Sequence, residues 1–139
     1  MRAPEQPVEK SAQLSGRRHT FLRIAWLCTL TCVVAISLAP SDSTPKRTMD
    51  ALNVSDKLLH FVAYFVLMLL PALHETRLST ALHAVGIVAL GITVEFLQSP
   101  LAGRPFDAGD VVANLAGVLA ALVAAEAGPR FSLMQSRGA

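Results

Sequence analysis

Ionisable side chains occur at three places inside strongly apolar stretches, and their chemistry has to be explained first. These residues are His60, Glu95 and Asp110. An ionisable group at the middle of a membrane helix costs about 2.5 to 3.5 kcal/mol, so such groups usually face a bundle interior or a water-filled cavity. His60 or Glu95 could act there as a general base, which makes them the candidate catalytic residues. No nucleophile motif points to a particular reaction.

Further polar residues accompany these three at helical spacing. Tyr64 follows His60 by four residues and Asn114 follows Asp110 by four, so each pair lies on one face of a helix. The basic residues of the set could hold a phosphate or carboxylate group. The candidate ligand-binding residues are Asp56, Lys57, Tyr64, Gln98, Arg104, Asp107, Asp110 and Asn114.

The same residues also have an ordinary structural interpretation. Acidic residues near helix starts can be caps, basic residues can extend to lipid headgroups, and Glu95 can pair with Arg104. The depths of the three buried groups favour a site. His60, Glu95 and Asp110 are each expected about one turn, roughly 5 Å, below the same membrane face. We therefore expect them to converge in one polar pocket, with Arg104 reaching Glu95 or Asp110.

The composition indicates that the helices carrying these residues lie in a membrane. Of the 139 residues, 53% are hydrophobic and 16% are charged, whereas a soluble domain has about 25% charged residues. A soluble fold of this size would leave large apolar patches facing water. The net charge of +2 is too small for a nucleic-acid surface, so no nucleic-acid partner is expected. The lipid bilayer is the expected surrounding.

Four apolar segments are long enough to cross a bilayer, and they predict an all-α, integral membrane bundle of four transmembrane helices. The third helix is expected to stop at Ser99, because Pro100 disfavours helical angles in the preceding residue. The fourth is expected to begin at Asp107 as a cap, with Asp110 completing a capping box. A cleaved signal peptide is the alternative for the first segment, but Pro40 disfavours cleavage. The segments are residues 21–39, 58–73, 79–98 and 107–127.

Basic residues predict the orientation of the bundle. Eight Lys and Arg residues fall on the side that holds both termini and four on the other side. Positive charge is retained in the cytoplasm, so both termini are expected there and the polar pocket is expected to face outward from the inner membrane. The chain would divide into a flexible polar tail over residues 1–20, a four-helix domain over 21–127 and a short polar tail over 128–139.

Small residues recur at every fourth position of the fourth helix. They let helices approach closely, and we expect tight packing inside the chain. Contact with a membrane partner through Gly109, Ala113 and Gly117 is the alternative. The small residues are Gly109, Ala113, Gly117, Ala121 and Ala125.

No cofactor and no metal site are expected. Cys28 and Cys32 lie in an apolar run without a nearby His or carboxylate to complete a tetrahedral set. His19, His74 and His83 are interpreted as interfacial or solvated residues.

Two blocks of the sequence resemble the VanZ-like family of small bacterial membrane proteins. The first is SDKLLHFVAYFVL, with Asp56, Lys57, His60, Phe61 and Tyr64. The second is VEFLQSPLAGRPFDAGDVVANLAG, with Glu95, Gln98, Arg104, Asp107, Asp110, Asn114 and Gly117. The tail before Thr20 lies outside the resemblance. The resemblance implies a multi-pass membrane fold; one member is linked to low-level teicoplanin resistance, which is not carried over to this chain.

Three classes of function fit these features. The first is a site that binds or modifies an amphiphilic ligand, such as a lipid-linked cell-envelope precursor. The second is a small transporter, and the third is an assembly subunit of a membrane complex. The cytoplasmic half of the third helix lacks a continuous series of polar residues that could carry a proton or cation, which argues against transport. An open mouth lined by the polar residues would argue against a purely structural role.

Overall fold

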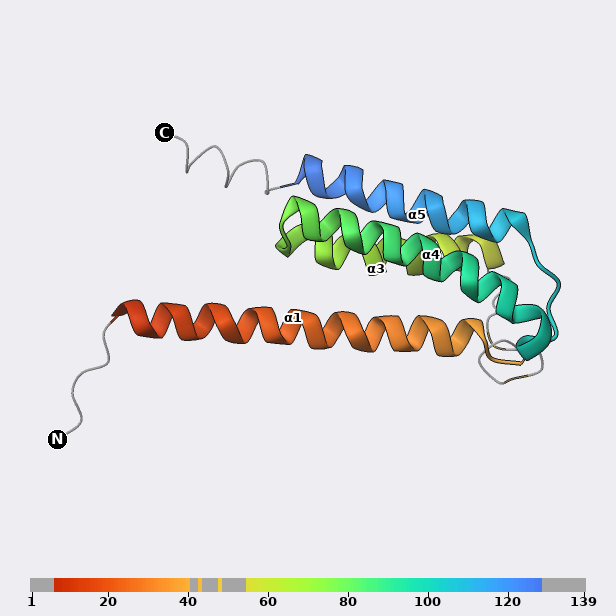
Figure 1. Cartoon of the computed structure of the whole chain (residues 1–139), viewed down its shortest axis with the longest axis horizontal. Helices are drawn as coiled ribbons and strands as arrows, with labels where there is room; N and C mark the ends of the chain where they lie inside the picture. Colours follow the sequence, from red (N-terminus) through yellow and green to blue (C-terminus); the bar gives the residue numbers. More distant parts are fainter. Residues whose placement is uncertain (1–6, 41–42, 44–47, 49–54, 129–139) are drawn as a thin grey trace.

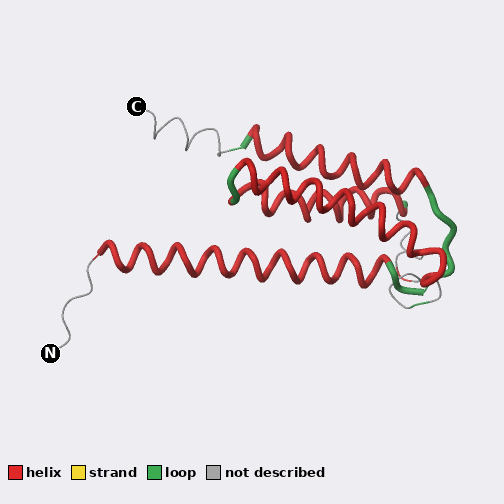
Figure 2. The backbone as a smooth tube through the Cα atoms, in the orientation of Figure 1, coloured by secondary structure: helices red, strands yellow, loops and turns green. Residues whose placement is uncertain are grey.

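The computed structural model describes residues 7–40, 43, 48 and 55–128. No strand occurs among these residues, and most of them lie in long helices (Figure 2). Each long helix contains a segment that is long and apolar enough to cross a membrane. The prediction of an all-α bundle with four membrane-spanning helices is therefore confirmed. The helices are α1 (Pro7–Ser37), α3 (Asp56–His74), α4 (Arg77–Ala102) and α5 (Ala108–Ala127) (Figure 1).

The four helices run up and down, so that the start of α1 and the end of α5 lie toward the same end of the bundle (Figure 1). The connection from α4 to α5 lies at the opposite end. A chain that crosses a membrane an even number of times has both of its ends on the same side. Which end faces the cytoplasm is indicated by the basic residues alone and stays a prediction.

Helix α1 is longer than the sequence predicted. It begins at Pro7 instead of Phe21, so residues 7–20, expected to be a flexible tail, are helical, while residues 1–6 lie outside the described part of the chain. The prediction relied on apolar spacing alone. Residues such as Glu9, Lys10 and Ala12 are good helix formers, and adding them to an existing helix carries no nucleation cost. The apolar span within α1 is His19–Ser37.

Helix α4 also continues past its predicted end. It passes through Pro100 and ends at Gly103, whose φ of 67° is a left-handed conformation that a glycine adopts without strain. The backbone N–H groups of Gly103 and Arg104 both donate to the carbonyl oxygen of Gln98. The left-handed turn at Gly103 directs both N–H groups to this carbonyl oxygen and so sets the end of the helix. The helix continues through Ser99 although Pro100 disfavours helical angles there.

Helices α3 and α5 form the most extensive contact in the bundle, with α4 packed beside them. A Cβ atom on Gly117 would lie 2.4 Å from the carbonyl oxygen of Phe61 and 2.9 Å from the backbone nitrogen of Phe65. Backbone therefore meets backbone at this point, which confirms that the fourth helix makes the closest contact within the chain. The core beside it is largely apolar and consists of Tyr64, Leu67, Met68, Ala72, Ile87, Val118, Ala121 and Ala125.

The small-residue face of α5 is covered from within the chain. The side chain of Lys57 lies over Gly109, and the α3 backbone lies over Gly117. These two positions are thus not open to the membrane partner that the alternative interpretation assigned to Gly109, Ala113 and Gly117.

The outer surfaces of the helices are apolar, as a bilayer requires. Large exposed apolar side chains occur on all four, including Ile24 of α1, Val62 of α3, Leu82 of α4 and Val123 of α5. A hydrogen bond joins α1 to α3, because Trp26 Nε1 donates to the carbonyl oxygen of Leu67 at 2.9 Å.

Substituting Gly117 tests the close α3–α5 contact. We expect Gly117→Ala to lower the free energy of unfolding by about 1 to 3 kcal/mol, because the added methyl group meets backbone that cannot move aside. Gly86→Ala is the matched control, since nothing lies within 4 Å of the Cβ position there. Thermal unfolding in detergent measures both variants. Equal stability of the two variants would contradict the packing described.

Cysteine labelling tests the orientation. In a chain with Cys28 and Cys32 replaced by serine, a cysteine at Ser55 should react with an impermeant maleimide on intact spheroplasts. A cysteine at Thr76, at the opposite end, should react only after lysis. The reverse pattern would overturn the assignment of both termini to the cytoplasm.

Candidate functional site

A buried carboxylate, that of Asp110, lies at the centre of the polar residues in the first turn of α5. Only 2% of this residue is exposed. Its Oδ1 lies 3.4 Å from Lys57 Nζ, and its Oδ2 lies 3.5 Å from His60 Nε2 and 3.8 Å from Arg104 Nη2. The spacing of three residues places Lys57 and His60 on one face of α3. We call the following residues the Asp110 cluster: Asp56, Lys57, His60, Arg104, Asp107, Asp110 and Asn114.

Asn114, one turn further along α5, orients the imidazole of His60. The Nδ1 atom of His60 lies 3.0 Å from Asn114 Oδ1, and both residues are buried. An amide oxygen can only accept, so Nδ1–H donates. In the neutral ring Nε2 then carries a lone pair, and this lone pair faces the carboxylate of Asp110.

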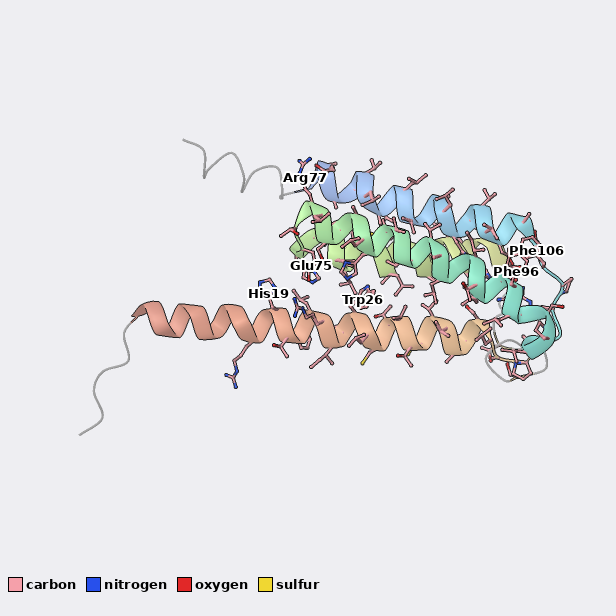
Figure 3. All side chains as sticks on the ribbon, viewed as in Figure 1. His19, Trp26, Glu75, Arg77, Phe96 and Phe106 are labelled. Atoms are coloured by element: carbon pink, nitrogen blue, oxygen red, sulfur yellow. The ribbon has the colours of Figure 1, made fainter. Side chains whose placement is uncertain are left out.

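The connection between α4 and α5 carries Arg104 into the cluster. Arg104 Nη2 contacts Asp56 Oδ2 on α3 as well as Asp110. The rings of Phe96 and Phe106 lie 5.1 Å apart and join this connection to α4 (Figure 3). Glu95 and Asp110 are the two partners expected for Arg104, and the ion pair is with Asp110.

Asp107 caps α5 and belongs to the outer rim of the cluster. Its Oδ1 accepts from the backbone N–H of Gly109 at 2.6 Å, and its Oδ2 lies 2.5 Å from Lys57 Nζ. The hydrogen bond from the Lys57 ammonium group, together with that from Gly109, holds the pKa of Asp107 below its usual range. Asp107 therefore stays ionised through mildly acidic pH.

The predicted capping box is wrong. The backbone N–H of Asp107 donates to Glu95 Oε1 at 2.7 Å instead of to Asp110. The carboxylate of Asp110 lies among Lys57, His60 and Arg104, and these contacts prevent it from turning back onto its own helix. Glu95 is the residue that completes the start of α5.

Glu95 and Gln98 are both fully buried on α4. The depth expected for Glu95 rests on a helix end at Gln98, whereas α4 ends at Ala102, seven residues after Glu95. Glu95 nevertheless reaches the cluster, because its carboxylate contacts the start of α5. Gln98 Nε2 donates to the carbonyl oxygen of Ser37 at 3.1 Å and so joins α4 to α1. Glu95 Oε2 and Gln98 Oε1 are buried without a hydrogen-bond partner in the described part of the chain.

A cavity of about 230 Å³ lies between α1 and α3 next to the cluster. Asp56, His60 and Tyr64 supply its polar lining, and Val33 and Ile36 contribute apolar lining. Tyr64 is 1% exposed, and its hydroxyl group has no hydrogen-bond partner among the residues described.

Gly91 is a site residue that the sequence analysis missed. A Cβ atom there would lie 2.9 Å from Tyr64 Cε1 and 3.1 Å from Asn114 Nδ2. The glycine leaves room for both side chains between α4 and its neighbours. A glycine inside an apolar helix is a signal of close packing that could have identified it.

The structure thus brings the predicted residues to one end of the bundle by different routes. The members of the Asp110 cluster contact one another directly, and Glu95 contacts the backbone of Asp107. Tyr64 lines the cavity beside the cluster. Gln98 instead contacts the backbone of Ser37 on α1. Glu75 and His19 lie toward the other end (Figure 3). Catalytic or ligand-binding roles for the converging residues stay predictions.

Removing Arg104 tests whether it neutralises buried carboxylates. We expect Arg104→Ala to lower the free energy of unfolding by about 1 to 3 kcal/mol at pH 7. The loss should exceed that of an exposed arginine, because a buried carboxylate that loses its cation stays uncompensated. Asp107 is ionised at pH 7 because its pKa is lowered, and its ion pair loses its stabilising effect only below about pH 4.

Melting curves in detergent at pH 7 measure the loss in each variant. Arg77→Ala is the control, because Arg77 is exposed and its nearest acidic partner is Glu126 at 3.9 Å. Equal losses for Arg104→Ala and Arg77→Ala would show that the buried carboxylates do not depend on Arg104.

Comparison with known proteins adds an independent finding to this geometry. The profile of the family described as VanZ/LLP1 matches residues 3–128. Neither the curated proteins nor the solved structures give a match. The match begins at residue 3, so the expectation that the resemblance excludes the segment before Thr20 is wrong. Because the match covers all four membrane-spanning helices and most of the chain, the protein belongs to the VanZ/LLP1 family.

Proposed function

We propose that the Asp110 cluster faces the outside of the inner membrane and binds the anionic head of an amphiphilic ligand, such as a lipid-linked envelope precursor. One observation carries the proposal. Arg104 directs Nη2 toward Asp56 and Asp110, while its Nη1 is buried without a hydrogen-bond partner in the described residues. A buried donor that lacks an acceptor is costly, and a guanidinium group pairs well with phosphate or carboxylate.

Other groups at the same end suit the remainder of such a ligand. Glu95 Oε2 and the Tyr64 hydroxyl are buried without partners among the described residues, so they could bind hydroxyl or amide groups of a polar head. The cavity next to the cluster has apolar lining from Val33, Ile36 and Ala63. A lipid tail fits that lining, because the cavity lies between two membrane-spanning helices.

A modifying activity would use the same residues. His60 Nε2 carries the lone pair in the neutral ring, because Asn114 accepts from the other ring nitrogen. It is therefore the better placed general base, with Glu95 as the second candidate.

Two other classes of function receive less support. Below the cluster, α3 and α5 are closed by Leu67, Met68 and Ala121, which are fully buried and apolar. Such packing offers no polar path and favours a one-sided site over transport. An assembly role through Gly117 is disfavoured because α3 covers that residue.

Binding of a polyprenyl phosphate tests the proposal. Native mass spectrometry of the full chain in detergent would compare undecaprenyl phosphate with undecaprenol, which lacks the anion, and with phosphatidylglycerol, an ordinary anionic lipid. We expect the polyprenyl phosphate to bind more tightly than both.

Arg104→Ala should weaken that binding at least about tenfold, because charge-assisted hydrogen bonds contribute about 1.5 to 3 kcal/mol. Arg77→Ala, at the other end of the bundle, should bind as the wild type does. Equal binding of the phosphate and the alcohol, or an unchanged affinity in Arg104→Ala, would refute the anion site.

A further inference from the structure

Three residues of the Asp110 cluster have the donor atoms of a metal site. Asp56, His60 and Asp110 each offer one ligand atom, and these atoms lie within 4.8 Å of one another. Two ligands bound about 2.1 Å from one ion in tetrahedral geometry lie about 3.4 Å apart. His60 Nε2 and Asp110 Oδ2, at 3.5 Å, already have this spacing. The side chain of Asp56 is 38% exposed, so it has the freedom to close the remaining distance.

The orientation of His60 favours a cation between these groups. Asn114 accepts from Nδ1–H, so in the neutral ring the Nε2 lone pair and the Asp110 carboxylate face each other as two acceptors. Two acceptors in contact repel unless a proton or a metal ion lies between them. Metal-binding histidines commonly donate their other ring N–H to an oxygen atom, as His60 does here.

The formal charge of this end of the bundle matches a divalent ion. Four carboxylates lie in the cluster or contact it, and two basic side chains accompany them, which leaves −4 + 2 = −2 with all carboxyl groups ionised and His60 neutral. Uncompensated charge inside a membrane protein is costly. The groups counted are Asp56, Glu95, Asp107, Asp110, Lys57 and Arg104.

The cavity beside the cluster supplies an independent observation. Tyr64 is almost fully buried, its hydroxyl group lacks a hydrogen-bond partner within the described residues, and it lines the same 230 Å³ cavity as Asp56 and His60. A water molecule occupies about 30 Å³ of liquid, so the cavity has room for waters that would complete a coordination shell.

We propose that Asp56, His60 and Asp110 bind one divalent ion, Zn²⁺ or Mn²⁺. A donor set of one imidazole nitrogen and two carboxylate oxygens suits these ions better than Mg²⁺ or Ca²⁺. The sequence predicts no metal site at the cysteines or at the other histidines, and only the fold brings Asp56, His60 and Asp110 together.

Metal binding is measured with the ion alone, so its outcome is separate from that of the anion site. Purified full-length protein is stripped with a chelator, loaded with Zn²⁺, Mn²⁺ or Mg²⁺ and desalted. Elemental analysis then gives the ions bound per chain. We expect about one Zn²⁺ or Mn²⁺ per chain, little Mg²⁺, and a melting midpoint that rises with the loaded ion.

Variants locate the ion. Asp56→Asn changes a partly exposed ligand and should weaken binding at least about tenfold while the protein still folds. Asn114→Ala keeps all three ligands but frees the imidazole, and should weaken binding about 10- to 100-fold. His83→Ala, at the other end of the bundle, should leave binding unchanged.

The proposal is overturned if neither Zn²⁺ nor Mn²⁺ is retained by the wild type. It is also overturned if Asp56→Asn binds the ion as tightly as the wild type, or if His83→Ala abolishes binding. The last result would place the ion at the other end of the bundle.

Discussion

The burial of the Asp110 carboxylate is the constraint on which the polar end of this bundle depends. An isolated buried charge is too costly to persist, so partners must reach it from other parts of the chain. Lys57 and His60 come from α3, and Arg104 comes from the connection before α5. This requirement holds α3 against α5, and Gly117 makes the approach possible one turn below Ala113 because it has no side chain.

The bundle is consequently different at its two ends. At one end, charged and amide groups lie together beside a cavity and leave several hydrogen-bonding atoms without partners among the described residues. Further along, α3 and α5 meet through Leu67, Met68 and Ala121, with no space for polar groups between them. Membership of the VanZ/LLP1 family agrees with the membrane architecture. The chemical roles proposed above derive from the charged end alone.

Hydropathy was sufficient to locate the four spans, but the ends of helices depended on interactions that hydropathy does not record. Helix α1 starts early because polar residues can extend an existing helix, and α4 ends at Gly103 because a left-handed glycine directs N–H groups to Gln98. The site was predictable where it depended on helical spacing, as for His60 and Asn114. Its details depended on competition between partners: Glu95 took the N–H group that the sequence assigned to Asp110.

The central claim, that Arg104 compensates the buried charge of Asp110, is tested most directly by a double-mutant cycle. Arg104→Ala is measured once in the wild type and once in the Asp110→Ala background, by the free energy of unfolding at pH 7. The account predicts a coupling energy of about 1 kcal/mol or more, because removing Arg104 matters less when no carboxylate remains at position 110. Equal effects in the two backgrounds would show that the two residues do not interact and would contradict the account.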